Sequence, residues 1–361
     1  MVDKMGLHSG IRACFVPHIP FGFIYGGAEV QAQSTLNCLN AMGHDAFWLD
    51  LTDHTLLERT DIFHFFGADI EFAYWIHSAI ADRPVVVSSI FSEPSILRRL
   101  GWHYGRLLPG TTPRRLARLL REATLILPNS EAESEALRAL FGVDPRSIRV
   151  IPNGVDVTFI GSDPASFRAR YLNDWPSDAP FVLCAGRIEW RKNQLMLAES
   201  CLQAGVRLVL VGQLAPNTDS EYQQRLLALI GSNPKFLKYM GAIPRSDMPD
   251  AYAAAAVHAL VSTWETTGLT SLEAGLNGCN LVVGDCPPVR EYFGDIATIV
   301  HQDERSVREG IEEALRLPRD AHGQSKIIAQ KYSWTRVAEM TADAYREAIE
   351  RHGRTAEGAS S

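Results

Sequence analysis

Short apolar segments, rich in β-branched and aromatic residues, alternate with helical patterns along nearly the whole sequence. Nearly continuous apolar strands that are separated by helices are typical of parallel sheets covered on both faces. The alternation lapses between about residues 150 and 180, where Pro152, Asn153 and Gly154 interrupt regular structure. The candidate strands therefore fall into two groups: 11–17, 45–51, 61–66, 83–90 and 124–129, then 180–186, 206–212, 257–262, 280–285 and 296–300.

Two groups of strands predict two doubly wound α/β domains. The length of 361 residues also favours two domains over one. We place the N-terminal domain at residues 1–155 and the C-terminal domain at residues 156–332. The apolar periodicity near the end predicts a last helix at about 333–352, and the polar residues 353–361 are expected to be disordered.

The composition argues against several classes of protein. The sequence has no run of 18 apolar residues, and its start has too little apolar length for a signal peptide, so the cytoplasm is the expected location. The six cysteines lack CxxC spacing, and we expect reduced core thiols rather than disulfides or zinc ligands. The net charge of −7 argues against general nucleic-acid binding.

Ligands of open parallel sheets bind at the carboxyl ends of the strands, so the loops that follow the strands are searched first. After residues 180–186, Arg187 and Lys192 flank a turn into a helix that begins near Asn193. Two cations beside the unpaired amides of a helix N-terminus could bind a diphosphate. A solvated basic turn would have the same composition, and the segment alone does not decide between the two.

The loop after residues 257–262 carries Glu265 and Glu273, eight positions apart. Gly268, between them, permits close approach of a ligand to the backbone, and the helix that starts there leaves amides unpaired. Glu273 lies about five residues further on, roughly 7–8 Å along the axis, and helical side chains tilt back toward the N-terminus. It could accept the two hydroxyls of a ribose, although acidic residues near a helix start also simply complement the helix dipole.

The loop after the first strand contains Gly26 and Gly27, with Glu29 in the first turn of the helix that follows. The spacing of Gly22, Gly26 and Gly27 differs from the GxGxxG of dinucleotide-binding proteins, so this pair is weak on its own.

Taken together, these segments resemble the motifs of the family 4 glycosyltransferases, which have the GT-B fold. The resemblance implies two Rossmann-like domains that face each other across a cleft, with a nucleotide-sugar donor held mainly by the C-terminal domain and an acceptor held mainly by the N-terminal one. It also implies that the last helix packs back onto the N-terminal domain. The matching stretches are GGAE (26–29), IPNGVD (151–156), GRIEWRKN (186–193) and the EX7E glutamates of WETTGLTSLEAG (264–275).

The resemblance also assigns roles to individual residues. Arg187 and Lys192 match the family's diphosphate ligands, Glu273 matches the glutamate that binds the ribose, and Glu265 matches the glutamate next to the donor sugar. We assign catalysis to Glu265, Arg187 and Lys192. Members of the family are retaining enzymes that need neither a metal ion nor another cofactor. The backbone amides expected to face the donor are those of Gly27, Gly268 and Leu269.

The sequence departs from the family pattern in two places. Thr266 and Thr267 stand where the family usually has Gly-Phe, close to the expected donor sugar. Residues 88–90 (Ser-Ser-Ile) stand where many members carry a histidine. His64 aligns with another family histidine, but a lone histidine in an apolar strand is more often a core residue or a pocket wall than a functional group. The candidates for acceptor binding are His64, Ser89 and Glu93.

Residues 94–121 carry seven arginines and no acidic residue, interleaved with Trp102, Tyr104, Leu107 and Leu108. This pattern is typical of a surface that binds the anionic headgroups of a membrane. A solvated arginine-rich helix face, or a groove for an anionic acceptor, would fit the same residues.

The sequence therefore predicts a cytoplasmic glycosyltransferase, at the inner face of the membrane if residues 94–121 bind lipid. It is expected to be retaining and metal-independent, and to move a sugar from a nucleotide donor to a glycan, lipid-linked or small-molecule hydroxyl in polysaccharide or glycoconjugate synthesis. The alternatives are a non-catalytic GT-B module that binds glycan or a partner transferase, and a hydrolysing nucleotide-sugar epimerase.

Overall fold

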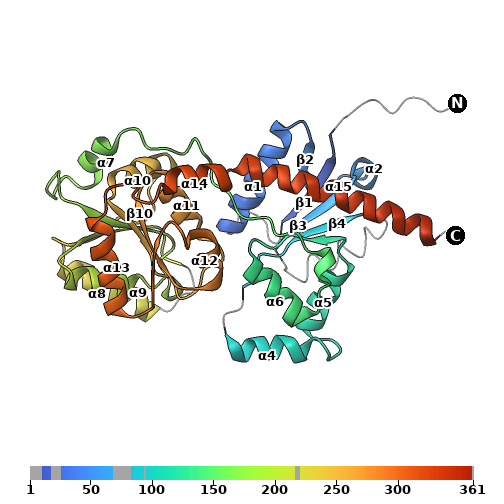
Figure 1. Cartoon of the computed structure of the whole chain (residues 1–361), viewed down its shortest axis with the longest axis horizontal. Helices are drawn as coiled ribbons and strands as arrows, with labels where there is room; N and C mark the ends of the chain where they lie inside the picture. The colour runs from blue at the N-terminus through green and yellow to red at the C-terminus, as the bar shows by residue number, and fades with distance from the viewer. Residues whose placement is uncertain (1–9, 18–25, 68–82, 93–94, 216–219, 360–361) are drawn as a thin grey trace. The chain divides into compact units, whose positions relative to one another are not determined.

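Two parallel β-sheets form the core of the chain, as the alternating sequence pattern predicts. The computed structural model describes residues 10–17, 26–67, 83–92, 95–215 and 220–359. Within them one sheet has five strands and the other six, and the prediction of two parallel α/β domains is confirmed (Figure 1). The chain divides into two compact units: unit 1, residues 1–154 with 334–361, and unit 2, residues 155–333.

Unit 1 is built on the five-stranded sheet, with the order β2–β1–β3–β4–β5. Helix α15 packs along α1, so the last helix belongs to the same unit as the first strands (Figure 1). The strands are β1 (Arg12–Pro17), β2 (Asp45–Trp48), β3 (Ile62–Phe66), β4 (Val85–Ser88) and β5 (Leu125–Ile126). The helices are α1 (Gly27–Ala41), α2 (Leu56–Arg59), α4 (Ile96–Gly105), α5 (Thr112–Glu122), α6 (Glu131–Phe141) and α15 (Trp334–Ala359).

Strand β3 shows how the sheet of unit 1 is covered on both faces. Successive side chains of a strand point to opposite faces. Phe63 and Phe65 pack in one apolar cluster with Leu120 of α5 and Leu137 of α6. His64, between them, points to the opposite face, where it contacts α15. The strand can therefore be apolar almost throughout, because neither face meets water.

Unit 2 is built on the six-stranded sheet, with the order β8–β7–β6–β9–β10–β11. Its strands are β6 (Phe181–Ala185), β7 (Arg207–Val211), β8 (Leu237–Tyr239), β9 (Val257–Leu260), β10 (Asn280–Gly284) and β11 (Thr298–Val300). Its helices are α7 (Pro164–Tyr171), α8 (Gln194–Gln203), α9 (Ser220–Ser232), α10 (Met248–Ala254), α11 (Leu269–Leu276), α12 (Pro287–Phe293), α13 (Glu304–Arg316) and α14 (Gln324–Lys331).

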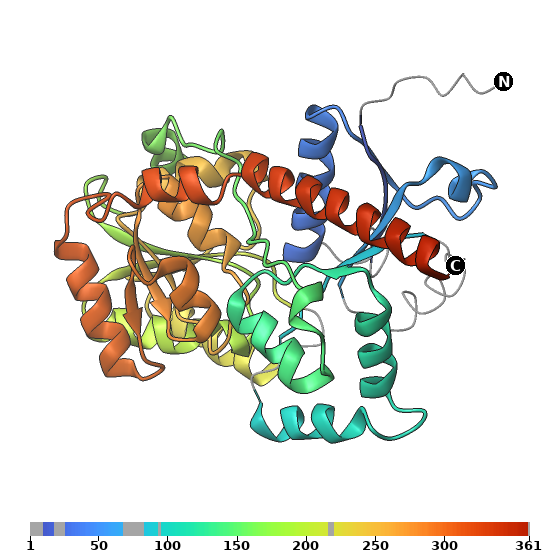
Figure 2. The ribbon, with the colours of Figure 1, turned by 45° about the vertical axis from the view of Figure 1, so that its right-hand side comes forward.

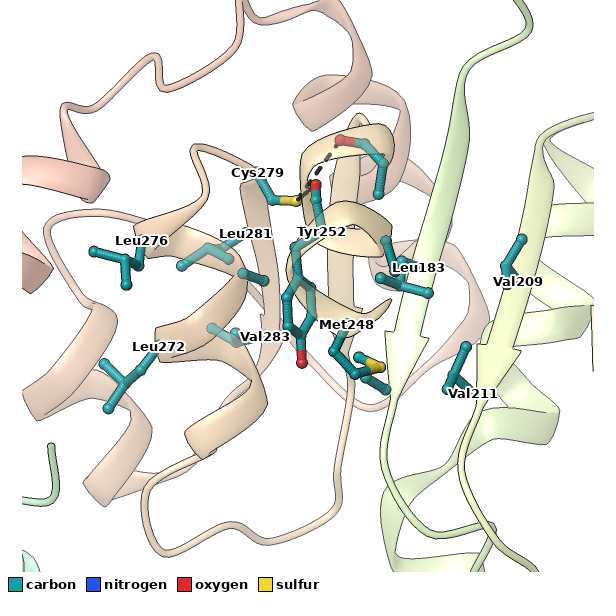
Figure 3. Packing of buried hydrophobic residues seen from close by; sticks show 14 of the residues in the cluster. Leu183, Val209, Val211, Met248, Tyr252, Leu272, Leu276, Cys279, Leu281 and Val283 are labelled. Atoms are coloured by element: carbon teal, nitrogen blue, oxygen red, sulfur yellow. Dashed lines mark hydrogen bonds between the residues drawn. The ribbon is translucent and has the colours of Figure 1, made fainter. Parts of the chain in front are cut away.

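The sheet of unit 2 is also buried on both faces. On one face Leu183 of β6 shares an apolar cluster with Tyr252 of α10 and Leu272 of α11 (Figure 3). On the other face Val182 and Cys184 belong to a second cluster with residues of α8, α9 and α13. This burial accounts for the nearly continuous apolar runs from which the strands were predicted.

Two parts of the structure differ from the sequence prediction. Strand β8 was not predicted, because three residues are too few to show a periodic pattern. Helix α15 continues to Ala359, so residues 353–359 are helical rather than disordered. Arginine, alanine and glutamate in that segment are good helix formers, and a polar composition does not prevent an existing helix from continuing. No helix in the described residues is long and apolar enough to span a membrane.

Candidate functional site

The candidate site of unit 2 lies where its strand order reverses. The order changes direction between β6 and β9, and ligands of such sheets bind outside the carboxyl ends of the strands at this point. The loop after β6 contains the 3-10 helix η2 (Trp190–Lys192), and the loop after β9 leads into α11. The N–H of Thr263 donates to the carbonyl of Arg191 at 2.8 Å and ties the two loops together. The topology therefore brings the two sequence motifs into contact.

Lys192 and Glu265 form an ion pair across these loops. The Lys192 ammonium donates to Oε2 of Glu265, and the two side chains are 15% and 12% exposed. The hydroxyl of Ser262 and the N–H of Thr266 also donate to the carboxylate, both at 3.3 Å. Burial by itself raises the pKa of Glu265, but the charge and hydrogen bond of Lys192, together with Arg191 and the N–H of Thr266, outweigh it, and the net pKa lies below the usual range. Glu265 is therefore held as a carboxylate.

Glu273 has a cation of its own, Arg245. Arg245 lies on the 3-10 helix η3 (Arg245–Asp247) and donates from Nη1 to Oε2 of Glu273 at 2.9 Å and from Nη2 to Oε1. The hydroxyl of Tyr252, which is fully buried, donates to Oε2 at 2.9 Å. Burial, followed by the nearby carboxylate of Glu273, raises the pKa of Tyr252 well above its usual value. The phenol therefore stays protonated as a donor.

Gly268 is the N-cap of α11, with φ 80° and ψ 59°. This left-handed conformation favours glycine, because a side chain there would be strained. The first amides of a helix have no partner within the helix, so those at Leu269 and Thr270 are directed beyond the end of α11. The hydroxyl of Ser271 is fully buried and has no hydrogen-bond partner among the described residues. The start of α11 thus presents polar donors beside Glu265.

Arg187 follows β6 and is exposed to solvent. In the described part of the chain its side chain has no ion pair, while its carbonyl accepts a hydrogen bond from Gln194 at 2.7 Å. The structure thus brings Lys192 to Glu265. Sequence analysis missed Arg245 and Tyr252. The only signal for Arg245 was its place after β8, a strand that the periodicity did not reveal.

In unit 1 the strand order reverses between β1 and β3. Gly27, at the start of α1, follows β1, and the N–H of Gly26 donates to Glu29 at 2.7 Å. His64 of β3 is buried, with Nδ1 at 2.7 Å from the hydroxyl of Tyr345 and Nε2 at 2.9 Å from that of Ser88. Both ring nitrogens are therefore engaged within unit 1, as expected for a core histidine.

Burial lowers the pKa of His64 to about 3. The ring is consequently neutral at physiological pH, with one nitrogen as a donor and the other as an acceptor. The hydrogen bond between His64 and Tyr345 links α15 to the sheet.

Ser89 is held by Glu133, a buried carboxylate of α6. The Ser89 hydroxyl and the N–H of Phe91, at 2.7 Å, both donate to Oε1 of Glu133, and the N–H of Asn129 donates to Oε2 at 2.9 Å. Ile90, between the two residues that Glu133 binds, has φ 44°, which is unusual for a β-branched residue. The loop at the end of β4 is thus held in a strained conformation. Glu93, the remaining acceptor candidate, lies outside the described residues.

Helices α4 and α5 lie beside α6 at one edge of unit 1 (Figure 2). The sequence of these two helices is rich in arginine. Trp102, which we expected on the exposed surface, instead packs edge-on against Phe91 and Phe141. Five large apolar side chains of this segment are nevertheless exposed: Leu97, Leu100, Tyr104, Leu107 and Leu108.

The fold and the strand-end residues define a class: a protein of two doubly wound α/β domains, with paired acids and cations beside a helix N-terminus. Two family models match the chain, "Glycosyltransferase Family 4" over residues 46–159 and "Glycosyl transferases group 1" over residues 168–334. The chain belongs to this family of glycosyltransferases.

Individual relatives are distant. A D-inositol 3-phosphate glycosyltransferase of Kineococcus radiotolerans is 25% identical over 68% of this chain and 63% of its own length. An alpha-maltose-1-phosphate synthase of Mycobacterium tuberculosis is 25% identical over 63% of this chain and 64% of its own. The match to these curated relatives thus spans less than two thirds of their length.

A similar solved structure is HepE of Anabaena, crystallised in complex with UDP and glucose. It superposes with a TM-score of 0.70 at 19% identity, over 92% of this chain and 98% of that one. The similarity identifies the GT-B fold.

The buried His64 predicts a pH dependence of stability. The pKa of His64 in the folded chain is about 3, below the ordinary value of 6.5. Between these two pH values the imidazole is protonated in the unfolded chain but stays neutral in the folded chain. The neutral ring contributes fully to the free energy of unfolding above pH 6.5. As the pH falls toward 3, this contribution is lost, by up to about 1.4 kcal/mol per pH unit. In His64→Gln, urea unfolding followed by circular dichroism should depend less steeply on pH between 6.5 and 4.5.

His54→Gln is the matched control, because His54 is an exposed histidine of the same unit. In His54→Gln the free energy of unfolding should depend on pH as steeply as in the wild type. Equal slopes for the wild type and His64→Gln would contradict the assignment of a neutral, buried ring.

Proposed function

We propose that this chain transfers a sugar from a nucleotide-sugar donor to a hydroxyl group. The observation that carries the proposal is the convergence of Lys192, Glu265 and the Gly268-capped helix at the strand reversal of unit 2. Open α/β sheets bind their ligands at that point, and amides and cations there suit a diphosphate. The glycosyltransferase names of the relatives support the same class of reaction.

In the proposed complex, Arg187, Lys192 and the amides of Gly268 and Leu269 bind the donor diphosphate, and Glu273 binds the ribose. Glu265 lies beside the donor sugar, where a carboxylate stabilises positive charge that develops at the anomeric carbon. Gly27 of unit 1 stays a predicted contact of the diphosphate.

The departure of a nucleoside diphosphate develops negative charge on the leaving oxygen, and preorganised donors stabilise that charge. The proposed reaction therefore needs no metal ion. We further propose retention of the anomeric configuration, by displacement on the face from which the diphosphate departs. This displacement is proposed in preference to a covalent intermediate because the motif offers no obvious nucleophile apart from Glu265, whose carboxylate is paired with Lys192.

The names of the relatives do not point to one acceptor. One name contains inositol 3-phosphate, whereas another gives maltose 1-phosphate as the product. The acceptor is accordingly proposed only as a glycan, lipid-linked or small-molecule hydroxyl, in polysaccharide or glycoconjugate synthesis. UDP is the first donor nucleotide to test, because HepE was crystallised with it.

Nucleotide binding tests this proposal directly. UDP, GDP and ADP are screened by thermal shift, since a ligand at 100 times its dissociation constant adds about 2.7 kcal/mol of stability. One of them should raise the melting temperature of the wild type. No shift with any of the three would contradict the proposal, and a shift without sugar transfer would favour a non-catalytic module.

Loss of a proposed diphosphate ligand should slow the chemical step. Arg187→Ala and Lys192→Ala are each expected to reduce single-turnover rates about 10²- to 10³-fold with saturating donor, as the removal of such donors does in other enzymes. Arg225→Ala, which removes an exposed arginine of α9, is the control and should keep the wild-type rate. Near-normal rates in the first two variants would remove the diphosphate role.

We also propose that the exposed edge of α4 and α5 binds anionic membranes from the cytoplasmic side. Leu97, Leu107 and Leu108 are more than half exposed and lie among arginines. Apolar side chains with basic neighbours bind the interface of a lipid bilayer, and each basic residue near an anionic surface contributes about 1 kcal/mol.

Sedimentation with vesicles tests this surface. The wild type should bind vesicles that contain phosphatidylserine at 0.1 M salt, and should dissociate at high salt. Arg114→Ala/Arg115→Ala should weaken binding roughly 30-fold, since it removes two basic contacts of about 1 kcal/mol each. Arg305→Ala/Arg316→Ala, on the exposed face of α13, is the matched control. Equal loss in both double variants, or no binding at low salt, would contradict the proposal.

A further inference from the structure

The carboxylate of Glu273 is nearly saturated with donors from the protein. An ionised carboxylate offers about four acceptor positions, two on each oxygen. Arg245 occupies one position on Oε1 and one on Oε2, and Tyr252 occupies a second position on Oε2. Three positions are therefore filled, and Oε2 has none left.

A ribose presents two neighbouring hydroxyls, and a carboxylate that accepts both uses one position on each oxygen. Glu273 can accept the hydroxyl that meets Oε1. It cannot accept a second one at Oε2 unless Arg245 or Tyr252 withdraws.

The two protein donors differ in their freedom to withdraw. Tyr252 is fully buried, within the apolar cluster that contains Leu183 and Val283 (Figure 3). A buried hydroxyl that loses its acceptor stays without a partner, which costs free energy. Arg245 is 59% exposed and lies over the ring of Phe159, 4.0 Å from its centroid. Water can replace Glu273 around this guanidinium, so Arg245 is the donor that withdraws.

We propose that Arg245 is a displaceable counterion of Glu273, which the 2′- and 3′-hydroxyls of the bound nucleotide replace. The inference rests on the proposed function, because it takes a ribose as the ligand of Glu273. Arg245 is then a positioning residue that holds the carboxylate and competes with the ribose for it. A nucleotide without the 2′-hydroxyl cannot replace both bonds, and leaves the ion pair in place.

The preference for ribose over deoxyribose measures this competition. Isothermal titration calorimetry at pH 8 on the full chain gives the dissociation constants of the nucleoside diphosphate with the largest thermal shift and of its 2′-deoxy counterpart. Because both ligands carry the same base and diphosphate, their ratio isolates the hydroxyl. In Arg245→Met, which keeps an apolar stem over Phe159, the preference for ribose should rise by at least about two- to fivefold, the range of a fully exposed ion pair, because Glu273 is buried.

Salt provides a second readout that a merely structural role would not change. Salt weakens exposed ion pairs. The ribose preference of the wild type should therefore rise as the salt concentration is raised from about 0.05 M to about 0.5 M. The ribose preference of Arg245→Met should stay constant over the same range.

Arg170→Met is the matched control. Arg170 is also 59% exposed and pairs with Asp247 of the same 3-10 helix, but it has no bond to Glu273. The ribose preference of Arg170→Met should equal that of the wild type. Glu273→Gln should lose most of this preference.

The outcomes separate this inference from the proposed function. If the wild type binds no nucleoside diphosphate, the proposed function fails, and with it the ligand assumed here. If the wild type binds but the ribose preference falls or stays unchanged in Arg245→Met, only the displacement of Arg245 is overturned.

Discussion

The reversal of strand order between β6 and β9 is the constraint on which the candidate site depends. It directs the loops after both strands to one edge of the sheet. Lys192 and Glu265 are 73 residues apart, yet they form an ion pair at this edge. The parallel sheet beneath them is buried on both faces, so the ends of the two loops are anchored to a rigid core.

The two glutamates of the motif each have a cation, but the two ion pairs differ in burial. Lys192 and Glu265 are both largely buried, and separating them would leave a buried charge without compensation, which is costly. The side chain of Arg245 is 59% exposed and is solvated when it leaves Glu273, but the side chain of Glu273 is only 8% exposed, so its carboxylate needs replacement donors. Glu265 is thus held in one position and one charge state, whereas Glu273 can exchange its partner.

In unit 1 the polar side chains of β3, of β4 and of the loop after β4 are held by buried hydrogen bonds. His64 joins Ser88 of β4 to Tyr345 of α15, and Glu133 holds the backbone and hydroxyl on both sides of Ile90. Buried polar groups need such partners, because an unsatisfied donor or acceptor costs free energy. The segment that stands in place of the family histidine is therefore fixed by an internal network of hydrogen bonds.

The sequence by itself determined the two parallel domains and the loops that carry the charged motifs, because apolar periodicity and glycine positions are local signals. It did not reveal β8, which is too short for a period, or Arg245, which follows that strand. Only the tertiary structure decided that Lys192 binds Glu265, that Arg245 binds Glu273, and that His64 is neutral. Those pairings depend on strand order and burial, which join residues far apart in the chain and which no local pattern encodes.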